Sequence, residues 1–224
     1  MRNAILIFIF CLCASLLVNL GGIGVAYAMP ATKLAGKNFV FYVDISGSMS
    51  MSYHEKQSSK IDVAVKLLHA INDEMPDMDA NVGFYTYGPH LEYRRVTPFD
   101  RDQLRGAIRQ LPTDIPFSGR PTPMSAGIQN LDTTIAALPG NVAFIVITDG
   151  ESNFGDPPAE VIQDAYARHG NRLCFHFISF AKNSDEKALV KKLSDLSACS
   201  VTAEAVDLLD ESVRADFIAK VFGQ

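Results

Sequence analysis

The chain has 224 residues, of which 48% are hydrophobic, 20% charged and 9% aromatic. These proportions are typical of a globular protein, and they exclude a collagen-like chain, a low-complexity chain and a disordered acidic tail. The net charge is −5 and the sequence pI is near 5.5. Because such a chain offers no general attraction for a phosphate backbone, nucleic acid is not an expected partner.

The N-terminal segment is typical of an export signal. Arg2 supplies a positive charge, residues 5–20 are almost entirely apolar, and Ala26-Tyr27-Ala28 has the small-residue pattern of a cleavage site. The predicted organisation is a signal peptide over residues 1–28, a short segment over 29–36 and a single domain over 37–224. The alternative is a retained inner-membrane anchor, since an apolar run of this length could nearly span a bilayer. We therefore expect a periplasmic or secreted protein, which contacts the membrane only if this segment stays uncleaved.

The first half of the domain begins with a buried strand. Residues 38–43 (NFVFYV) form an apolar run without alternation, as in strands buried on both faces of a parallel sheet, and the run ends at Asp44. Ser59 and Asp62 have the spacing of a capping box and predict the start of a helix. Its core face recurs at helical intervals, at Ile61, Val65, Leu68, Ile71 and Met75. Residues 81–87 predict a second strand, and a turn at Gly88-Pro89 lets residues 91–96 pair back as a hairpin.

The second half continues the alternation of strands and helices. Asp100 predicts the cap of a short helix, and Thr122 followed by Pro123 predicts an N-cap with proline at the first helical position. Residues 142–147 (VAFIVI) predict another buried strand. The remaining elements are a helix from 156 to 170, a strand at 173–180, a helix at 184–196, a short strand at 199–202 and a helix at 207–222. The order predicts an α/β fold, in which a doubly wound, mostly parallel sheet has helices on both faces and one antiparallel edge hairpin.

Polar groups follow the two most apolar strands. Alternation after the first strand aims Asp44, Ser46 and Ser48 in one direction, and Asp149 follows the later strand. Because ligands of such sheets bind beyond the carboxyl ends of the strands, we expect these groups and Thr122 to meet at one edge. All their ligand atoms are oxygens, which suit Mg²⁺ and disfavour zinc and copper. Two carboxylates merely neutralise a divalent cation, which can therefore accept a further carboxylate from an Asp or Glu of another protein.

Three segments resemble the von Willebrand factor type A domain. They are Asp44-Ile45-Ser46-Gly47-Ser48, the Gly-x-x-Thr-Pro stretch from Gly119 to Pro123, and Thr148-Asp149-Gly150. The resemblance covers roughly residues 36–222 and implies that family's Rossmann-like fold. It also implies a complete metal-ion-dependent adhesion site for Mg²⁺ or Mn²⁺. The five implied metal-binding residues are Asp44, Ser46, Ser48, Thr122 and Asp149.

Two cysteines remain once the signal segment is removed. In an oxidising compartment Cys174 and Cys199 are expected to form a disulfide. The alternative is a pair of buried thiols that behave as small apolar side chains.

The loop after the first motif is rich in methionine. Met49, Met51 and Tyr53 form either a flexible apolar contact surface at the edge of the site or ordinary loop packing. Glu151, next to the later aspartate, is expected at the same rim without a metal role.

The sequence favours a binding module without enzymatic activity, in which the bound cation accepts a partner's carboxylate. One alternative is a structural or chaperone-type envelope assembly factor whose metal only stabilises loops. A Mg²⁺-dependent hydrolase of the aspartyl-phosphate type is a further alternative. Ser46 argues against it, because such enzymes carry a second acidic residue at that place. The chain also lacks a nucleophile elbow and a P-loop.

Overall fold

A computed structural model describes residues 38–53, 58–117 and 121–223. In this part of the chain, six strands form one sheet in the order β3-β2-β1-β4-β5-β6. The strands are β1 (Asn38–Asp44), β2 (Asn81–Tyr87), β3 (Leu91–Pro98), β4 (Val142–Thr148), β5 (Leu173–Ser179) and β6 (Thr202–Glu204). All neighbouring strands are parallel except β3, which pairs with β2 in the antiparallel sense. The predicted mostly parallel sheet with an antiparallel edge hairpin is confirmed, whereas the predicted signal peptide lies outside the described residues.

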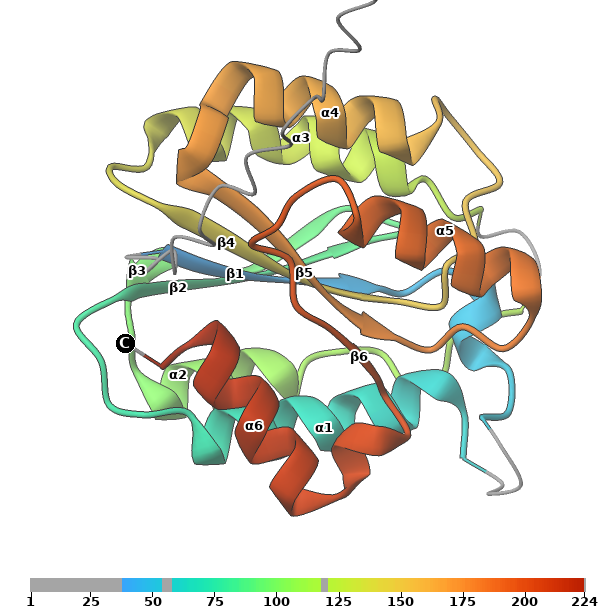
Figure 1. Cartoon of the computed structure of the whole chain (residues 1–224). Helices are drawn as coiled ribbons and strands as arrows, with labels where there is room; N and C mark the ends of the chain where they lie inside the picture. The colour runs from blue at the N-terminus through green and yellow to red at the C-terminus, as the bar shows by residue number, and fades with distance from the viewer. Residues whose placement is uncertain (1–37, 54–57, 118–120, 224) are drawn as a thin grey trace, which may run out of the picture. The chain divides into compact units, whose positions relative to one another are not determined.

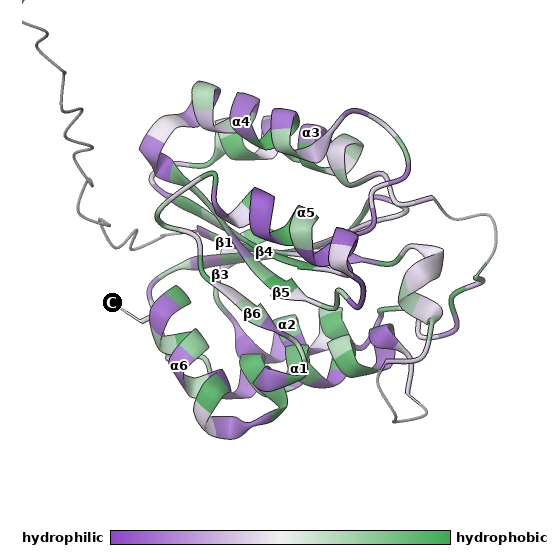
Figure 2. Ribbon diagram, turned by 45° about the vertical axis from the view of Figure 1, so that its right-hand side comes forward, coloured by the Kyte–Doolittle hydropathy of each residue, from purple (hydrophilic) through white to green (hydrophobic). Residues whose placement is uncertain are grey.

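Helices cover both faces of the sheet. The α-helices are α1 (Lys60–Glu74), α2 (Arg101–Ile108), α3 (Met124–Ala137), α4 (Pro158–His169), α5 (Ser184–Ser194) and α6 (Glu211–Val221). Short 3₁₀ turns are η1 (Gly47–Ser50), η2 (Gly170–Arg172) and η3 (Asp207–Leu209). Helices α1, α2 and α6 lie below the sheet in Figure 1, and α3, α4 and α5 lie above it. In Figure 2 the strands are mostly green, whereas the helices alternate between green and purple, as expected for amphipathic layers.

The central strand β1 shows why the sheet is buried on both faces. Its side chains alternate between two apolar cores. Phe39, Phe41 and Val43 pack with residues of α1, α2 and α6, whereas Val40 and Tyr42 pack with residues of α3, α4 and α5. Every residue of β1 is buried, which accounts for the apolar run without alternation in the sequence. The buried strand β1 therefore holds the start of the loop that follows its carboxyl end in a fixed position.

Most predicted element boundaries are close to those observed, with two corrections. The capping box of α1 is confirmed, because the Ser59 hydroxyl accepts the Asp62 N–H and the Asp62 carboxylate accepts the Ser59 N–H. The prediction of Thr122 as a helix cap is wrong, since Pro123 occupies the N-cap position of α3 and no side chain caps the helix. The predicted strand at residues 199–202 is displaced, and β6 begins at Thr202, where pairing with Phe177 starts.

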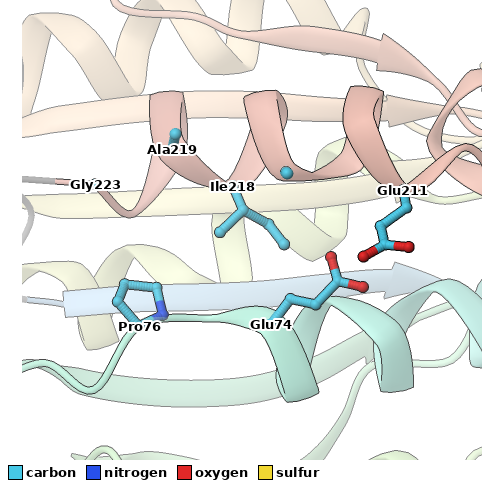
Figure 3. A pocket seen from close by; sticks show the side chains of 7 residues that line it. Glu74, Pro76, Glu211, Ile218, Ala219 and Gly223 are labelled. Atoms are coloured by element: carbon cyan, nitrogen blue, oxygen red, sulfur yellow. The ribbon is translucent and has the colours of Figure 1, made fainter.

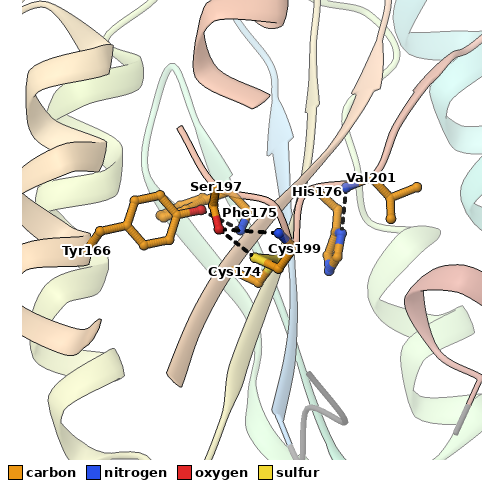
Figure 4. The surroundings of a disulfide bond; sticks show 7 residues. All are labelled: Tyr166, Cys174, Phe175, His176, Ser197, Cys199 and Val201. Atoms are coloured by element: carbon orange, nitrogen blue, oxygen red, sulfur yellow. Dashed lines mark hydrogen bonds between the residues drawn. A yellow bond between two sulfur atoms is a disulfide. The ribbon is translucent and has the colours of Figure 1, made fainter. Parts of the chain in front are cut away.

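A disulfide joins β5 to the loop before β6. Cys174 and Cys199 are bonded, with their Cα atoms 6.1 Å apart, so the predicted bridge is confirmed and the alternative of free thiols is wrong. Next to it, Nδ1 of the buried His176 accepts the Val201 N–H at 3.1 Å (Figure 4). Burial lowers the pKa of His176 to about 4, and the neutral ring therefore serves as an acceptor.

A pocket of about 450 Å³ lies between the C-terminal end of α1 and helix α6 (Figure 3). It is lined by Glu74, Pro76, Glu211, Ala215, Ile218, Ala219 and Gly223. The polar groups that follow β1 and β4 lie near the opposite end of α1, so this pocket does not belong to them. No helix within the described residues combines the length and the apolar character that a bilayer span requires.

Candidate metal site

The sheet brings the two predicted aspartates to the same edge. Strands β1 and β4 are parallel neighbours, and their register pairs Val43 with Ile147. Asp44 at the end of β1 and Asp149, which comes directly after the last residue of β4, Thr148, therefore lie at the same edge of the sheet. Both side chains are fully buried. Their proximity is also seen in the electrostatics, because the charge of Asp149 contributes to a raised pKa at Asp44.

The loop after β1 is folded tightly around its own hydroxyl groups. Asp44 Oδ1 accepts the Ser46 N–H at 2.8 Å, and the hydroxyl oxygens of Ser46 and Ser48 are 3.1 Å apart. Gly47 lies against the loop between α2 and α3, where a Cβ atom would collide with the carbonyl oxygen of Phe117. Glycine is therefore required for the close approach of the two loops. The structure thus brings Asp44, Ser46 and Ser48 together, as the sequence predicts.

Thr122 lies on the second loop and is tied to the third. Its side chain is buried, and its backbone N–H donates to Asn153 Oδ1 at 2.9 Å. Asn153 belongs to the segment that follows Asp149, so this bond fixes the threonine loop to the loop after β4. Gly119, the first residue of the predicted Gly-x-x-Thr-Pro motif, lies outside the described residues. Asn153 is not among the predicted site residues, because a single asparagine in a loop has no recognisable pattern.

Asp149 is held by two contacts. Its Oδ1 accepts the Glu151 N–H at 3.1 Å, and its Oδ2 accepts from Lys60 Nζ at 2.7 Å. Both members of this ion pair are buried, with side-chain exposures of 2% for Lys60 and 0% for Asp149. Sequence reasoning missed Lys60. The sequence feature that could have indicated Lys60 is its position directly after the Ser59 cap, where the helix dipole disfavours a positive charge.

Two buried oxygens, Asp44 Oδ2 and Thr122 Oγ1, lack a hydrogen bond of normal geometry from the described residues, although the Tyr87 hydroxyl lies close enough to Asp44 to lower its pKa in part. Buried polar atoms are satisfied in the great majority of cases, and exceptions often mark the place of an ion or a water molecule. Burial first, and the charge of Asp149 second, raise the pKa of Asp44 to about 7. The Asp44 carboxylate is thus short of positive charge, a condition that a divalent cation would relieve.

The donor chemistry fits a hard divalent cation. The predicted ligand groups are two carboxylates and three hydroxyls, and Mg²⁺ and Mn²⁺ prefer oxygen ligands of this kind. Within the described part of the chain, no cluster of three or more His, Cys, Asp or Glu side chains is arranged to hold a metal. A cation at this edge would therefore depend on hydroxyl oxygens from Ser46, Ser48 and Thr122 in addition to the carboxylates.

The predicted contact rim is only partly present. Met49 and Tyr53 are buried in the core below the sheet, so their interpretation as contact residues is wrong, and loop packing is the correct reading for them. The ring of Tyr53 lies 4.9 Å from that of Phe180. Met51 is 44% exposed and Glu151 is partly buried, and both remain at the surface near the site.

The fold and the site define an α/β domain with an oxygen-rich cluster at the carboxyl edge of its sheet. The family model described as "von Willebrand factor type A domain" matches residues 38–214. The chain therefore belongs to the von Willebrand factor type A family. None of the curated proteins compared with the chain matches it in sequence.

Solved structures support the same fold. BatB, a conserved hypothetical protein from Bacteroides thetaiotaomicron, is similar with a TM-score of 0.61 and 16% identity, over 82% of this chain and 96% of that one. An aerotolerance-related membrane protein from Bacteroides fragilis has a TM-score of 0.61 and 16% identity, over 83% and 98%. Manganese-loaded TRAP protein from Plasmodium vivax has a TM-score of 0.57 and 17% identity, over 84% and 74%. Identities this low establish the shared fold and carry no function across.

Proposed function

We propose that this protein is a binding module that recognises another protein through a divalent cation. Asp44, Ser46, Ser48, Thr122 and Asp149 would hold Mg²⁺ or Mn²⁺, and a carboxylate of the partner would complete the coordination shell. The observation that carries the proposal is a pair of buried oxygens, Asp44 Oδ2 and Thr122 Oγ1, that no hydrogen bond of normal geometry from the described residues satisfies. The manganese in the similar TRAP structure agrees with this choice of metal.

The surface around the site supports a protein partner. Three large apolar side chains are exposed, one on each loop that carries a predicted metal ligand: Met51 at 44%, Phe117 at 68% and Phe154 at 63%. Exposed apolar groups of this size are common at protein–protein contacts. A partner segment with an acidic residue beside apolar side chains would match this combination.

We also propose that the protein acts outside the cytoplasm, in the periplasm or as a secreted protein. The disulfide agrees with an oxidising compartment. Retention of the N-terminal segment as an inner-membrane anchor is the alternative. No residue of the site is given a catalytic role, because Ser46 stands where an aspartyl-phosphate enzyme would carry its second acid.

Thermal unfolding tests the metal part of the proposal. Mg²⁺ or Mn²⁺ should raise the melting temperature relative to EDTA, because a ligand that binds only the folded state stabilises it. Asp44→Ala should abolish this shift. The exposed loop residue Asp114 supplies the control, and Asp114→Ala should keep the shift. A metal shift that survives Asp44→Ala would contradict the proposed ligand set.

Partner binding separates this function from that of an assembly factor whose metal only stabilises loops. A partner purified from envelope extract should bind in Mg²⁺, should be released by EDTA, and should not bind the Asp44→Ala variant. If the partner binds equally well in EDTA while the metal still raises the melting temperature, the metal is structural, and the assembly-factor alternative is the correct one.

A further inference from the structure

Lys60 occupies a position that is unfavourable for a positive charge on two counts. It is the first residue of α1, where the helix dipole repels cations. Its side chain is also one of the largest that are fully buried, at 2% exposure. Removing an ammonium from water costs several kcal/mol unless a partner compensates for it. The side chain is therefore held in place by a specific interaction.

That interaction is with a residue of the proposed metal site. Lys60 Nζ donates to Asp149 Oδ2 at 2.7 Å, across 89 positions of sequence. The backbone of Lys60 is fixed as well, since its N–H donates to the carbonyl oxygen of Met51 at 2.9 Å. Helix α1 thus begins against the loop that carries Ser46 and Ser48, and the ammonium is aimed at the carboxylate from within the protein.

Lys60 changes the charge balance of the site. When both carboxylates are ionised, as ligation of a cation requires, Asp44 and Asp149 carry −2, and among the described residues Lys60 reduces this to −1. A divalent cation then leaves the buried cluster at +1, whereas without the lysine the cluster would be neutral. One carboxylate from outside restores neutrality in the presence of Lys60. An uncompensated buried charge is costly, so the lysine penalises the cation when no such carboxylate is present.

We propose that Lys60 makes metal binding at this site dependent on an external carboxylate. It weakens the affinity for the cation alone and couples cation binding to partner binding. This inference rests on the proposed function and assigns to Lys60 a positioning and charge-balancing role beside the ligands themselves. Because coupling between two ligands is reciprocal, the metal strengthens carboxylate binding by the same factor as the carboxylate strengthens metal binding.

Calorimetric titration with Mn²⁺ tests this role, with and without acetate as the carboxylate probe. The wild-type protein should bind Mn²⁺ more tightly in acetate than in chloride. Lys60→Met should bind Mn²⁺ at least tenfold more tightly than the wild type in chloride and should respond little to acetate. Lys60→Gln removes the charge but keeps an N–H donor for Asp149, and serves if the methionine variant does not fold.

Two further variants separate charge from structure. Lys60→Arg keeps the positive charge and should retain the acetate dependence of the wild type. Lys66→Met changes an exposed lysine of the same helix and should leave both affinities unchanged. If Lys60 has only a structural role, Lys60→Met and Lys60→Gln should lower the stability of the fold without tightening Mn²⁺ binding.

The outcomes distinguish this inference from the proposed function. If the wild type binds Mn²⁺ with an affinity that Lys60→Met and Lys60→Gln leave unchanged or weaken, the role of Lys60 is overturned and the metal site stands. If the wild type binds no Mn²⁺ in either buffer, the proposed function is overturned, and the role of Lys60 with it.

Discussion

Replacing each of the two buried aspartates with asparagine should change the stability of the metal-free fold in opposite directions. In the metal-free protein, no cationic side chain among the described residues offsets the burial of Asp44, whereas Asp149 neutralises Lys60 at 2.7 Å. Asp44→Asn should therefore stabilise the metal-free fold at alkaline pH. Asp149→Asn should destabilise it, because it leaves the ammonium of Lys60 buried without a counter-charge.

The magnitudes follow from the environment of each group. Folding raises the pKa of Asp44 from 3.8 to about 7, which corresponds to a cost of about 4 kcal/mol above pH 7. A buried amide without partners costs about 1–3 kcal/mol, so the net gain from Asp44→Asn is about 2 kcal/mol. Loss of one member of a buried ion pair costs about 3–5 kcal/mol, which is the loss expected for Asp149→Asn.

The pH dependence has a definite sign. Between pH 4 and pH 7 the folded state keeps the proton on Asp44, while the unfolded state has released it. The destabilisation caused by Asp44 therefore grows as the pH rises through this window and is complete above it. The net gain from Asp44→Asn should be present at pH 8, whereas near pH 4 only the cost of the buried amide remains and the variant should be no more stable than the wild type.

Urea unfolding in EDTA, followed by circular dichroism at about pH 4 and about pH 8, at the two ends of this window, measures these differences. Equal m-values among the wild type and both variants would show that the same transition is being compared. The reasoning is refuted if Asp44→Asn destabilises the protein at pH 8 as strongly as Asp149→Asn does.

Three further results are expected. Thr122→Val should weaken Mn²⁺ binding at least tenfold in calorimetry, whereas Thr133→Val on the exposed side of α3 should leave it unchanged; equal affinities would remove the threonine from the ligand set. Replacing Cys174 and Cys199 with serine should lower the free energy of unfolding by about 3.5 kcal/mol in urea titrations, given their separation of 25 residues, and an unchanged midpoint would contradict this. His176→Asn keeps an acceptor but does not titrate, so it should lack the contribution of His176, which lowers the stability of the wild type as the pH falls from 6.5 towards 4 and opposes the contribution of Asp44 in the same window; a stability difference between His176→Asn and the wild type that stays constant over this range would show that His176 makes no such contribution.

The sheet and the aspartates at its edge could be predicted because their signals are local. Each buried strand is an uninterrupted apolar run, and the residue at which the run stops, such as Asp44, is visible in the sequence. Because β1 and β4 are parallel neighbours, the residues at which their apolar runs end lie at the same edge of the sheet, as the pairing of Val43 with Ile147 shows. The Ser59 cap was equally predictable, because both partners of a capping box lie within four residues.

The contacts that complete the site could not be predicted, because they join distant segments. Lys60 meets Asp149 across 89 residues, and a lysine after a helix cap is ordinarily an exposed residue. Met49 lies in the 3₁₀ turn after the motif and Tyr53 lies beyond it, yet both pack into the core below the sheet. Burial in a loop depends on what packs over it, which a single sequence does not specify.

The central claim is that oxygens from three loops hold one divalent cation. Anomalous diffraction from crystals grown with Mn²⁺ tests it most directly. The account predicts a single strong peak beside Asp44 Oδ2 and Thr122 Oγ1, within ligand distance of the hydroxyls of Ser46 and Ser48. Crystals that diffract well and show no peak between these loops, or show one elsewhere that Asp44→Ala leaves intact, would contradict it.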